Sequence, residues 1–337
     1  MSFLENFHQQ RIMVFGDIIA DIYEFGTIHR LSREAPVPIV EFDSERMVPG
    51  GAGNVATNIA ALKGQVVPVS LIGEDEASRL LLQCLAEHDI TTKGILQSSD
   101  MAITTKRRVL AQGIHTVRQQ VIRLDRLPRK AAGERDLAVL MERFNRLISE
   151  VDAVVISDYN LPIIPRSFYK AITDSVKEHR KITIVDSRRS LLEFKGVTLL
   201  TPNREEAEEI VGRQLDNQSA LEYAGRTILE RTECKYLLIT LGDQGMALFQ
   251  QDQPMVLIPV FNRQEVFDVS GAGDTVVAAV TLGLLSGLPA PNAARLANIA
   301  AGLVVRKLGT ATVSLDELAE TLSLHPDLEA QLEMAIL

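Results

Sequence analysis

The sequence predicts an α/β protein in which helices cover both faces of a mostly parallel sheet. Short apolar, β-branched runs alternate with helical stretches along most of the chain. These runs lack a polar/apolar alternation, which is typical of strands buried on both faces. Two segments with a more polar pattern interrupt the order and predict a second, small sheet.

Six segments have the strand pattern of the main sheet: residues 11–17, 66–73, 153–159, 182–187, 198–203 and 236–242. Ligands of open α/β sheets bind at the carboxyl ends of the strands. We therefore expect the polar or glycine residues at these ends to line a site, namely Asp17, Asp158, Asp186, Asn203 and Gly242. Taken singly, each strand-end aspartate is equally well explained as a cap or turn residue.

The small sheet is predicted from residues 18–48 and 102–125. The first segment contains APVPIVEF, whose prolines suit an edge strand. The second alternates polar and apolar residues around Gln112-Gly113, which is typical of a hairpin. We expect one domain over residues 1–337, with a small antiparallel sheet as a lid over the crevice. The exposed face of this lid is also a candidate surface for forming a homodimer.

Composition excludes several classes of function. The 337 residues are 46% hydrophobic and 23% charged, as in ordinary globular proteins. A net charge of −9 argues against a nucleic-acid partner, which needs a basic surface. Cys84 and Cys234 lie far apart and predict neither a zinc site nor a disulfide framework. The polar N-terminus and the absence of a long apolar run predict a cytoplasmic protein without membrane contact.

The segment DVSGAGDT, residues 268–275, predicts an anion site. Three small residues, Gly271, Ala272 and Gly273, precede Asp274 at the start of an apolar helical stretch. Backbone N–H groups of small residues at a helix start form a concavity that attracts phosphate. A carboxylate at its rim is placed to take a proton from an attacking hydroxyl, which is the minimum needed for phosphoryl transfer. A helix start with an acidic first turn fits the spacing equally well.

A second glycine-rich turn, PGGAGN, opens another helical stretch. Gly50 and Gly51 allow close approach of the backbone to a ligand, and Asn54 can bind hydroxyl groups. The turn lacks the Gly-Lys-Ser/Thr of a phosphate-binding P-loop, and it does not follow the first strand as a dinucleotide fingerprint does. A tight strand-to-helix turn would also require these glycines.

These segments, taken in order, resemble the ribokinase (PfkB) family of sugar kinases. The resemblance rests on Asp17, GGAGN, TPNREE at residues 201–206, TLGDQG at 240–245, and DVSGAGDT, and it extends over residues 11–315. It implies a ribokinase-like fold, ATP and Mg²⁺ as cofactors, and a sugar as the phosphoryl acceptor.

The resemblance also implies a role for each matching residue. Asp274 would be the catalytic base, and the amides of residues 271–273 would form the anion hole. Sugar hydroxyls would be held by Asp17, Gly50, Gly51 and Asn54. Asn203 and Glu206 match an NxxE element that acts through Mg²⁺ and its waters, although an acidic helix alone would also explain Glu206. The nucleotide would lie along Thr240, Gly242, Gly245 and, at the adenine, Asn298. Whether a monovalent cation such as K⁺ binds near Asp268 stays open.

A narrower resemblance, to bacterial heptose-7-phosphate kinases of ADP-heptose and lipopolysaccharide synthesis, appears in LSREAPVPIVEF, TKRRVL, IRLD and KLGTATVS. It implies phosphorylation of D-glycero-β-D-manno-heptose 7-phosphate at O1. Candidates for binding the acceptor's phosphate are Lys106, Arg107, Arg108 and Arg123. Neighbours on a strand point to opposite faces, so only alternate members of residues 106–108 can face one ligand.

Two departures from that group leave the acceptor open. The chain has SDYNLPI where the group has SDYAKG, and it therefore lacks a lysine. It has DSRR where the group has DPKG, so Arg188 replaces a lysine and can grip phosphate with its two-pronged side chain. Asp186 remains as a contact to the sugar or to metal-bound water. Fructose, ribose and fructose 6-phosphate stay open as acceptors.

Other functions are weighed against this one. No HxGH-type nucleotidyltransferase motif occurs, so we expect a stand-alone kinase or a kinase half expressed alone. A catalytically inactive sugar- or nucleotide-binding regulator is the alternative of another class, and the retained Asp274 argues against it. A nicotinamide-dependent oxidoreductase would need a GxGxxG turn after the first strand, which is missing. Residues 316–337 are helical in pattern and offer no site residue.

Overall fold

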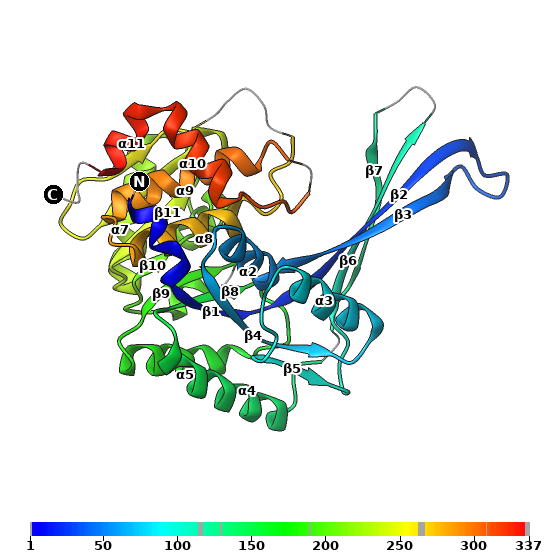
Figure 1. The fold of residues 1–337 in the computed structure, drawn as a ribbon, viewed down its shortest axis with the longest axis horizontal. Coiled ribbons are helices and arrows are strands. Elements are labelled where there is room, and N and C mark those ends of the chain that lie inside the picture. The colour runs from blue at the N-terminus through cyan, green and yellow to red at the C-terminus, as the bar shows by residue number, and fades with distance from the viewer. Residues whose placement is uncertain are drawn as a thin grey trace.

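The computed structural model describes residues 2–113, 117–128, 130–188, 190–261, 267–307 and 309–333. They form a nine-stranded main sheet and a four-stranded small sheet (Figure 1). The main sheet has the order β13-β12-β11-β10-β9-β8-β1-β4-β5. Its strands are parallel from β11 to β5, and β12 and β13 are antiparallel at one edge. The predicted α/β class is therefore confirmed.

All six predicted strands of the main sheet form. The sheet consists of β1 (Arg11–Gly16), β4 (Gln65–Gly73), β5 (Ile95–Ser98), β8 (Ala153–Asp158), β9 (Ile182–Ser187), β10 (Leu199–Leu200), β11 (Tyr236–Thr240), β12 (Met246–Gln250) and β13 (Val256–Ile258). The strand predicted over residues 198–203 is reduced to the two residues of β10. Pro202 has no N–H for the ladder, and Asn203 already caps the next helix.

Helices cover both faces of the main sheet. One face carries α1 (Ser2–Glu5), α2 (Ala52–Ala61), α3 (Glu76–Glu87), α8 (Ala272–Leu285), α9 (Ala290–Val304), α10 (Leu315–Leu324) and α11 (Pro326–Glu333). The other carries α4 (Glu134–Leu147), α5 (Arg166–Glu178), α6 (Arg204–Val211) and α7 (Gln218–Thr232).

Strand β1 shows why the central strands are apolar throughout. Ile12 and Val14 belong to the core on one face, whereas Met13 and Phe15 belong to the core on the other. All four side chains are fully buried. A polar residue at any of these positions would lose its contact with water without gaining a partner.

The small sheet has the order β3-β2-β6-β7 and projects from the body of the molecule (Figure 1). Its strands are β2 (Ile18–Leu31), β3 (Pro38–Gly51), β6 (Thr104–Gly113) and β7 (Gln119–Arg126). Strand β3 is an edge strand, as its prolines predict. Strands β6 and β7 pair antiparallel, as the hairpin pattern predicts; residues 114–116 between them lie outside the described residues.

One detail of the predicted small sheet is wrong. It is not wholly antiparallel, because β2 and β6 run parallel to each other. The two strands follow β1 and β5, which are themselves parallel strands of the main sheet, so both leave that sheet in the same direction. Among the residues that the structure describes, no helix has the length and apolarity needed to cross a bilayer.

Candidate active site

The candidate site lies where adjacent parallel strands end. Strands β11, β10, β9, β8 and β1 are neighbours in the main sheet, so their carboxyl ends form one row. Asp17 follows β1, Asp186 lies near the end of β9, and an isolated parallel bridge joins Asn203 to Thr240. The predicted row of strand-end residues is thus brought together along one edge.

Two glycine turns bring the starts of α2 and α8 against this row. Gly271 has φ +80°, and a Cβ there would lie 2.6 Å from Asn54 Nδ2. Gly51 has φ +59°, and a Cβ there would lie 2.3 Å from the Asp17 carbonyl oxygen. Only glycine combines this conformation with such close contacts. The Thr275 hydroxyl donates to Asn58 Oδ1 at 2.7 Å, which ties α8 to α2.

Asp274, in the first turn of α8, is buried and held by two donors. The Asn54 side-chain amide donates to Oδ2 at 2.6 Å, and the Tyr159 hydroxyl donates to Oδ1 at 3.0 Å. Burial raises the pKa of Asp274 to about 6, although both hydrogen bonds oppose the rise. The carboxylate is therefore fixed in orientation and ionised above pH 6, which suits a group that accepts a proton.

The backbone N–H groups predicted to form an anion hole lie at the start of α8. The N–H groups of Gly273 and Asp274 have no backbone acceptor among the described residues. The first N–H groups of a helix are the ones that bind anions. The Ala272 N–H instead donates to the Val269 carbonyl at 3.2 Å, so one of the predicted donors is already engaged.

Asp17 is buried and offers one oxygen without a partner. Its Oδ2 accepts from the backbone N–H groups of Tyr159 at 3.0 Å and Leu161 at 3.3 Å. Its Oδ1 has no hydrogen-bond partner among the described residues. Burial, and then the charge of Asp158, raise the pKa of Asp17 to about 7. A ligand hydroxyl would supply the missing donor.

The glycine and asparagine of the PGGAGN turn contact the protein itself. A Cβ at Gly50 would lie 2.0 Å from Asp21 Oδ2, so this glycine makes room for a neighbouring carboxylate. The Asn54 amide is bound to Asp274. In this arrangement Asn54 orients the candidate base, whereas the sequence predicted a contact to sugar hydroxyls.

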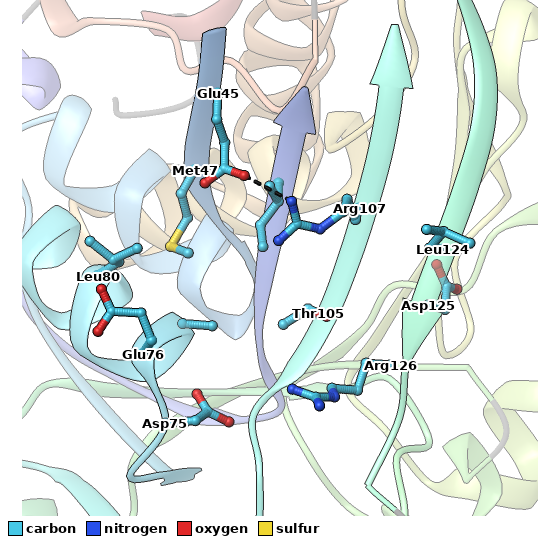
Figure 2. Close-up of a pocket in the computed structure, with 12 residues that line it drawn as sticks. Glu45, Met47, Asp75, Glu76, Leu80, Thr105, Arg107, Leu124, Asp125 and Arg126 are labelled. Carbon is cyan, nitrogen blue, oxygen red and sulfur yellow. Dashed lines mark hydrogen bonds and ion pairs between the residues drawn. The ribbon is translucent and has the colours of Figure 1, made fainter. Parts of the chain in front are cut away.

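The basic residues of β6 divide between the two faces of the small sheet. Arg107 forms ion pairs with Glu24 and, at 2.8 Å, with Glu45. Figure 2 shows Arg107 in a groove of about 540 Å³ between the small sheet and α3, with Asp75 and Glu76 on the opposite wall. This groove lies on the face opposite to the candidate site.

The other face carries Lys106 and Arg108, which differ in their partners. Arg108 forms an ion pair with Asp21, and Arg123 on β7 forms two hydrogen bonds with Asp125, at 2.8 and 2.7 Å. The Lys106 ammonium lies over a tyrosine ring instead, 5.2 Å from its centroid.

That ring belongs to Tyr159, and Arg188 from the end of β9 lies over it as well, at 4.4 Å. Within the described part of the chain, neither Lys106 nor Arg188 has a carboxylate in hydrogen-bond contact. Burial lowers the pKa of Lys106, the charge of Asp21 opposes this effect, and the positive charge of Arg188 adds to it. Carboxylates lie in the surroundings, Asp21 near Lys106 and both Asp186 and Asp274 near Arg188, but no hydrogen bond to them is formed by either cation among the described residues. Two cations that repel each other and keep their hydrogen-bond donors free of carboxylates form a candidate site for an anion.

Asn203 and Glu206 form a capping box at the start of α6. Asn203 Oδ1 accepts from the Glu206 N–H, and Glu206 Oε2 accepts from the Asn203 N–H, both at 2.9 Å. Nearby, burial and then the charges of Asp274 and Glu206 raise the pKa of Asp186 to about 8. Among the described residues, no group of three or more His, Cys, Asp or Glu side chains is arranged to hold a metal ion. A divalent cation near Asp186 and Glu206 would therefore be held largely through water and phosphate oxygens, an environment that Mg²⁺ prefers.

The residues predicted to bind the nucleotide lie at two places: Thr240, Gly242 and Gly245 at and after the end of β11, and Asn298 in α9. Gly242 and Gly245 have φ +63° and +91°, and a Cβ at Gly245 would lie 2.0 Å from the Ile258 carbonyl oxygen. Asn298 is buried and its amide donates to the Pro259 carbonyl at 2.7 Å. It lines a cavity of about 200 Å³ with both apolar and polar walls; the apolar residues include Ile258, Phe261 and Leu328, and Arg295 and Gln331 are polar.

Asp268 lies in the loop before α8 and stabilises it through hydrogen bonds. Its two carboxylate oxygens accept from the N–H groups of Ser270 at 2.9 Å and Gly309 at 3.0 Å. The carboxylate therefore links the anion-site loop to the segment before α10.

Two residues of the site were missed in the sequence. Tyr159 was noted only as part of a strand, yet it contacts Asp274 and lies under two cations. Asp21 is 4% exposed and pairs with Arg108. Its position two residues before Tyr23 in an otherwise apolar run was the available signal, since a buried carboxylate in a strand needs a partner.

The sequence profile described as pfkB family carbohydrate kinase matches residues 9–318. The chain belongs to the pfkB family of carbohydrate kinases. It is therefore a phosphotransferase that acts on sugars, and membership implies ATP with a divalent metal ion.

A relative from Trichlorobacter lovleyi, named "Bifunctional protein HldE", is 38% identical to this pfkB-family chain over 325 residues. The match covers 96% of the chain and 65% of the relative. The chain thus spans about 65% of the length of the first curated relatives that it matches.

Solved structures share the fold. Arabidopsis thaliana ribokinase, complexed with ribose and ATP, has a TM-score of 0.72 at 19% identity, with 93% of this chain and 98% of that chain covered. Phosphofructokinase-2 from Escherichia coli, in complex with potassium, has a TM-score of 0.75 at 18% identity, with 94% and 98% covered. The predicted ribokinase-like architecture is confirmed.

Proposed function

We propose that the chain is an ATP-dependent kinase of a sugar phosphate, with D-glycero-β-D-manno-heptose 7-phosphate as acceptor and O1 as the hydroxyl that is phosphorylated. The observation that carries this proposal is the pair of cations, Lys106 and Arg188, beside the candidate base. The relatives named HldE support the choice of a heptose phosphate. A neutral sugar would offer neither cation an anionic hydrogen-bond acceptor.

The residues at the junction of α2 and α8 account for the chemistry. Asp274 accepts the proton of the acceptor hydroxyl, and Asn54 holds its carboxylate during the transfer. The N–H groups at the start of α8 face the phosphoryl group and stabilise its charge. ATP, when bound, supplies that phosphoryl group.

The acceptor is held from two sides. Asp17 accepts a hydrogen bond from a sugar hydroxyl through its unpartnered Oδ1. Lys106 and Arg188 bind the phosphate already on the sugar. Lys106 lies on the small sheet, so we expect that sheet to act as a lid that closes on the acceptor and excludes water.

The cofactors are Mg²⁺ and, near Asp268, K⁺. Glu206 is placed to hold Mg²⁺ through a water molecule, because it lies close enough to raise the pKa of Asp186. A few carboxylates together with phosphate oxygens and water are the environment that Mg²⁺ prefers. The structurally similar phosphofructokinase-2 from Escherichia coli has been solved in complex with potassium, which makes K⁺ the monovalent cation to test.

We also propose a homodimer formed through the small sheet. This sheet exposes large apolar side chains that a monomer would leave in water, among them Leu31, Phe42, Ile122 and Leu124. Light scattering at micromolar concentration should give twice the mass of the chain, and Phe42→Asp should give a monomer. Tyr223→Asp, an exposed aromatic on α7, is the matched control and should leave the mass unchanged. A wild-type monomer would contradict the proposal.

The test of function is an acceptor screen with Mg·ATP over heptose 7-phosphate, fructose 6-phosphate, ribose and fructose. We expect efficient turnover only with heptose 7-phosphate. Preference for fructose 6-phosphate would support the proposed phosphate site but contradict heptose 7-phosphate as the acceptor. Preference for ribose or fructose would contradict the role of Lys106 and Arg188. ATP binding without turnover of any acceptor would favour a regulator.

A further inference from the structure

Tyr159 connects three parts of the candidate site. Its hydroxyl donates to Asp274 Oδ1 at 3.0 Å, and its backbone N–H donates to Asp17 Oδ2 at 3.0 Å. Its ring lies under the ammonium of Lys106 and the guanidinium of Arg188. One residue therefore contacts the candidate base, the candidate hydroxyl acceptor and both candidate phosphate ligands.

We propose that Tyr159 is a positioning residue: its hydroxyl fixes the catalytic carboxylate of Asp274, and its ring holds Lys106 and Arg188 in place for the acceptor's phosphate. The inference rests on the proposed function, since it requires Asp274 as base and a phosphorylated acceptor. Tyr159 would thereby connect the site of the acceptor's phosphate, at Lys106 and Arg188, with the proposed base Asp274.

The hydroxyl acts together with Asn54. The two donors come from different elements, the end of β8 and the helix α2, and each binds a different oxygen of Asp274. Rotation of the carboxylate would break at least one of these bonds. A carboxylate oxygen can accept more than one hydrogen bond, so Asp274 still has the capacity to receive the acceptor's proton.

The ring acts on the cations. Lys106 comes from the small sheet and Arg188 from the main sheet, so Tyr159 lies where the two sheets meet at the site. An aromatic face attracts cations and keeps two like charges near each other before an anion arrives. A phosphate bound there would contact groups from both sheets, which favours closure of the small sheet on the acceptor.

Several charged groups face Asp274 from the elements around it. Asp21 on β2 raises the pKa of Asp274, Arg188 lowers it, and Asp186 on β9 lies close enough to interact with it. The hydrogen bond from Tyr159 favours the ionised form of Asp274. Loss of that hydroxyl alone should therefore raise the pKa of Asp274 and move the acid limb of activity to higher pH.

Two variants separate the hydroxyl from the ring. Tyr159→Phe keeps the ring, and we expect kcat to fall roughly tenfold, the acid limb to rise by about one pH unit, and KM for the acceptor to change little. Tyr159→Leu also removes the ring, and we expect KM for heptose 7-phosphate to rise about tenfold. Tyr236→Phe is the control, because Tyr236 carries Lys235 over its ring at the other end of β11. It should behave as wild type.

A measurement without acceptor separates this inference from the proposed function. In apo protein labelled at the aspartate carboxyl carbons, the NMR signal that Asp274→Asn removes should titrate about one pH unit higher in Tyr159→Phe than in wild type. Coincident titrations would overturn the role of the hydroxyl, whatever the acceptor. An unchanged KM in Tyr159→Leu would overturn the role of the ring. A wild type that prefers neutral sugars would overturn the proposed function and the role of the ring, and would leave the titration result standing.

Discussion

The junction of α2 and α8 differs from the small sheet in how its polar groups are held. At the junction, Asn54, Asn58 and Asp274 are buried. Hydrogen bonds connect Asn54 to Asn58 within α2, and Asn54 to Asp274 and Asn58 to Thr275 between the two helices. On the small sheet, Arg107 and Arg123 are more exposed and pair with carboxylates of the same sheet. Buried, hydrogen-bonded groups fix a geometry, whereas exposed ion pairs exchange partners at little cost. Under the proposed function, the proton transfer uses the rigid region, whereas Lys106, one of the two proposed phosphate ligands, comes from the adaptable one.

The largest expected effect is the loss of the base at the junction. Asp274→Asn removes the group that accepts the proton, and turnover should fall by about 10²–10⁴-fold while ATP binding persists. Steady-state kinetics measure the turnover, and an ATP titration measures the binding of ATP. Asp174→Asn, an exposed carboxylate on α5, is the control. Activity retained in Asp274→Asn would remove Asp274 from the chemistry.

A smaller loss should follow from disturbing the junction without removing a functional group. Gly271→Ala places a methyl group 2.6 Å from Asn54 Nδ2, at a backbone conformation that costs about 1–3 kcal/mol for other residues. Turnover should fall roughly tenfold to a hundredfold, since Asn54 must move away from Asp274. Gly212→Ala has a similar φ of +65° and meets no atom within 4 Å. Equal effects of both variants on turnover would show that backbone strain, and not the contact with Asn54, is responsible.

The smallest effect concerns stability at the end of β1. Burial raises the pKa of Asp17 to about 7, so the folded state keeps a proton that the unfolded state releases near pH 4. As pH rises from 4 through 7, the ionised carboxylate progressively favours unfolding. Asp17→Asn cannot ionise, so the melting temperature of Asp17→Asn minus that of wild type should increase from pH 4.5 to pH 8. A difference that stays constant with pH would contradict the raised pKa.

Much of this architecture could be predicted from sequence. The strands of the main sheet are apolar because both faces are buried, and their polar ends identify Asp17, Asp186 and Asn203. Period-two alternation also placed Arg107 on a different face from Lys106, as the ion pairs of Arg107 show. The local sequence pattern is sufficient to predict the strands, their polar ends and the face of a strand on which a residue lies.

The rest depends on contacts between residues far apart in the chain. The bond between Asn54 and Asp274 spans 220 positions, and the one between Tyr159 and Asp274 spans 115. A tyrosine after a strand has the same local pattern whether it lies in the core or at a site. The parallel pairing of β2 with β6 likewise follows from the order of the main sheet, which the local pattern does not contain.

The most direct test compares kcat/KM for heptose 7-phosphate with that for the same heptose without phosphate. Wild type should prefer the phosphorylated sugar strongly, and Lys106→Ala and Arg188→Ala should each reduce the preference about tenfold or more through KM, because each removes one cation from the phosphate. Arg123→Ala, whose guanidinium is already paired with Asp125, should retain most of the preference. Equal use of both sugars by wild type would contradict the account.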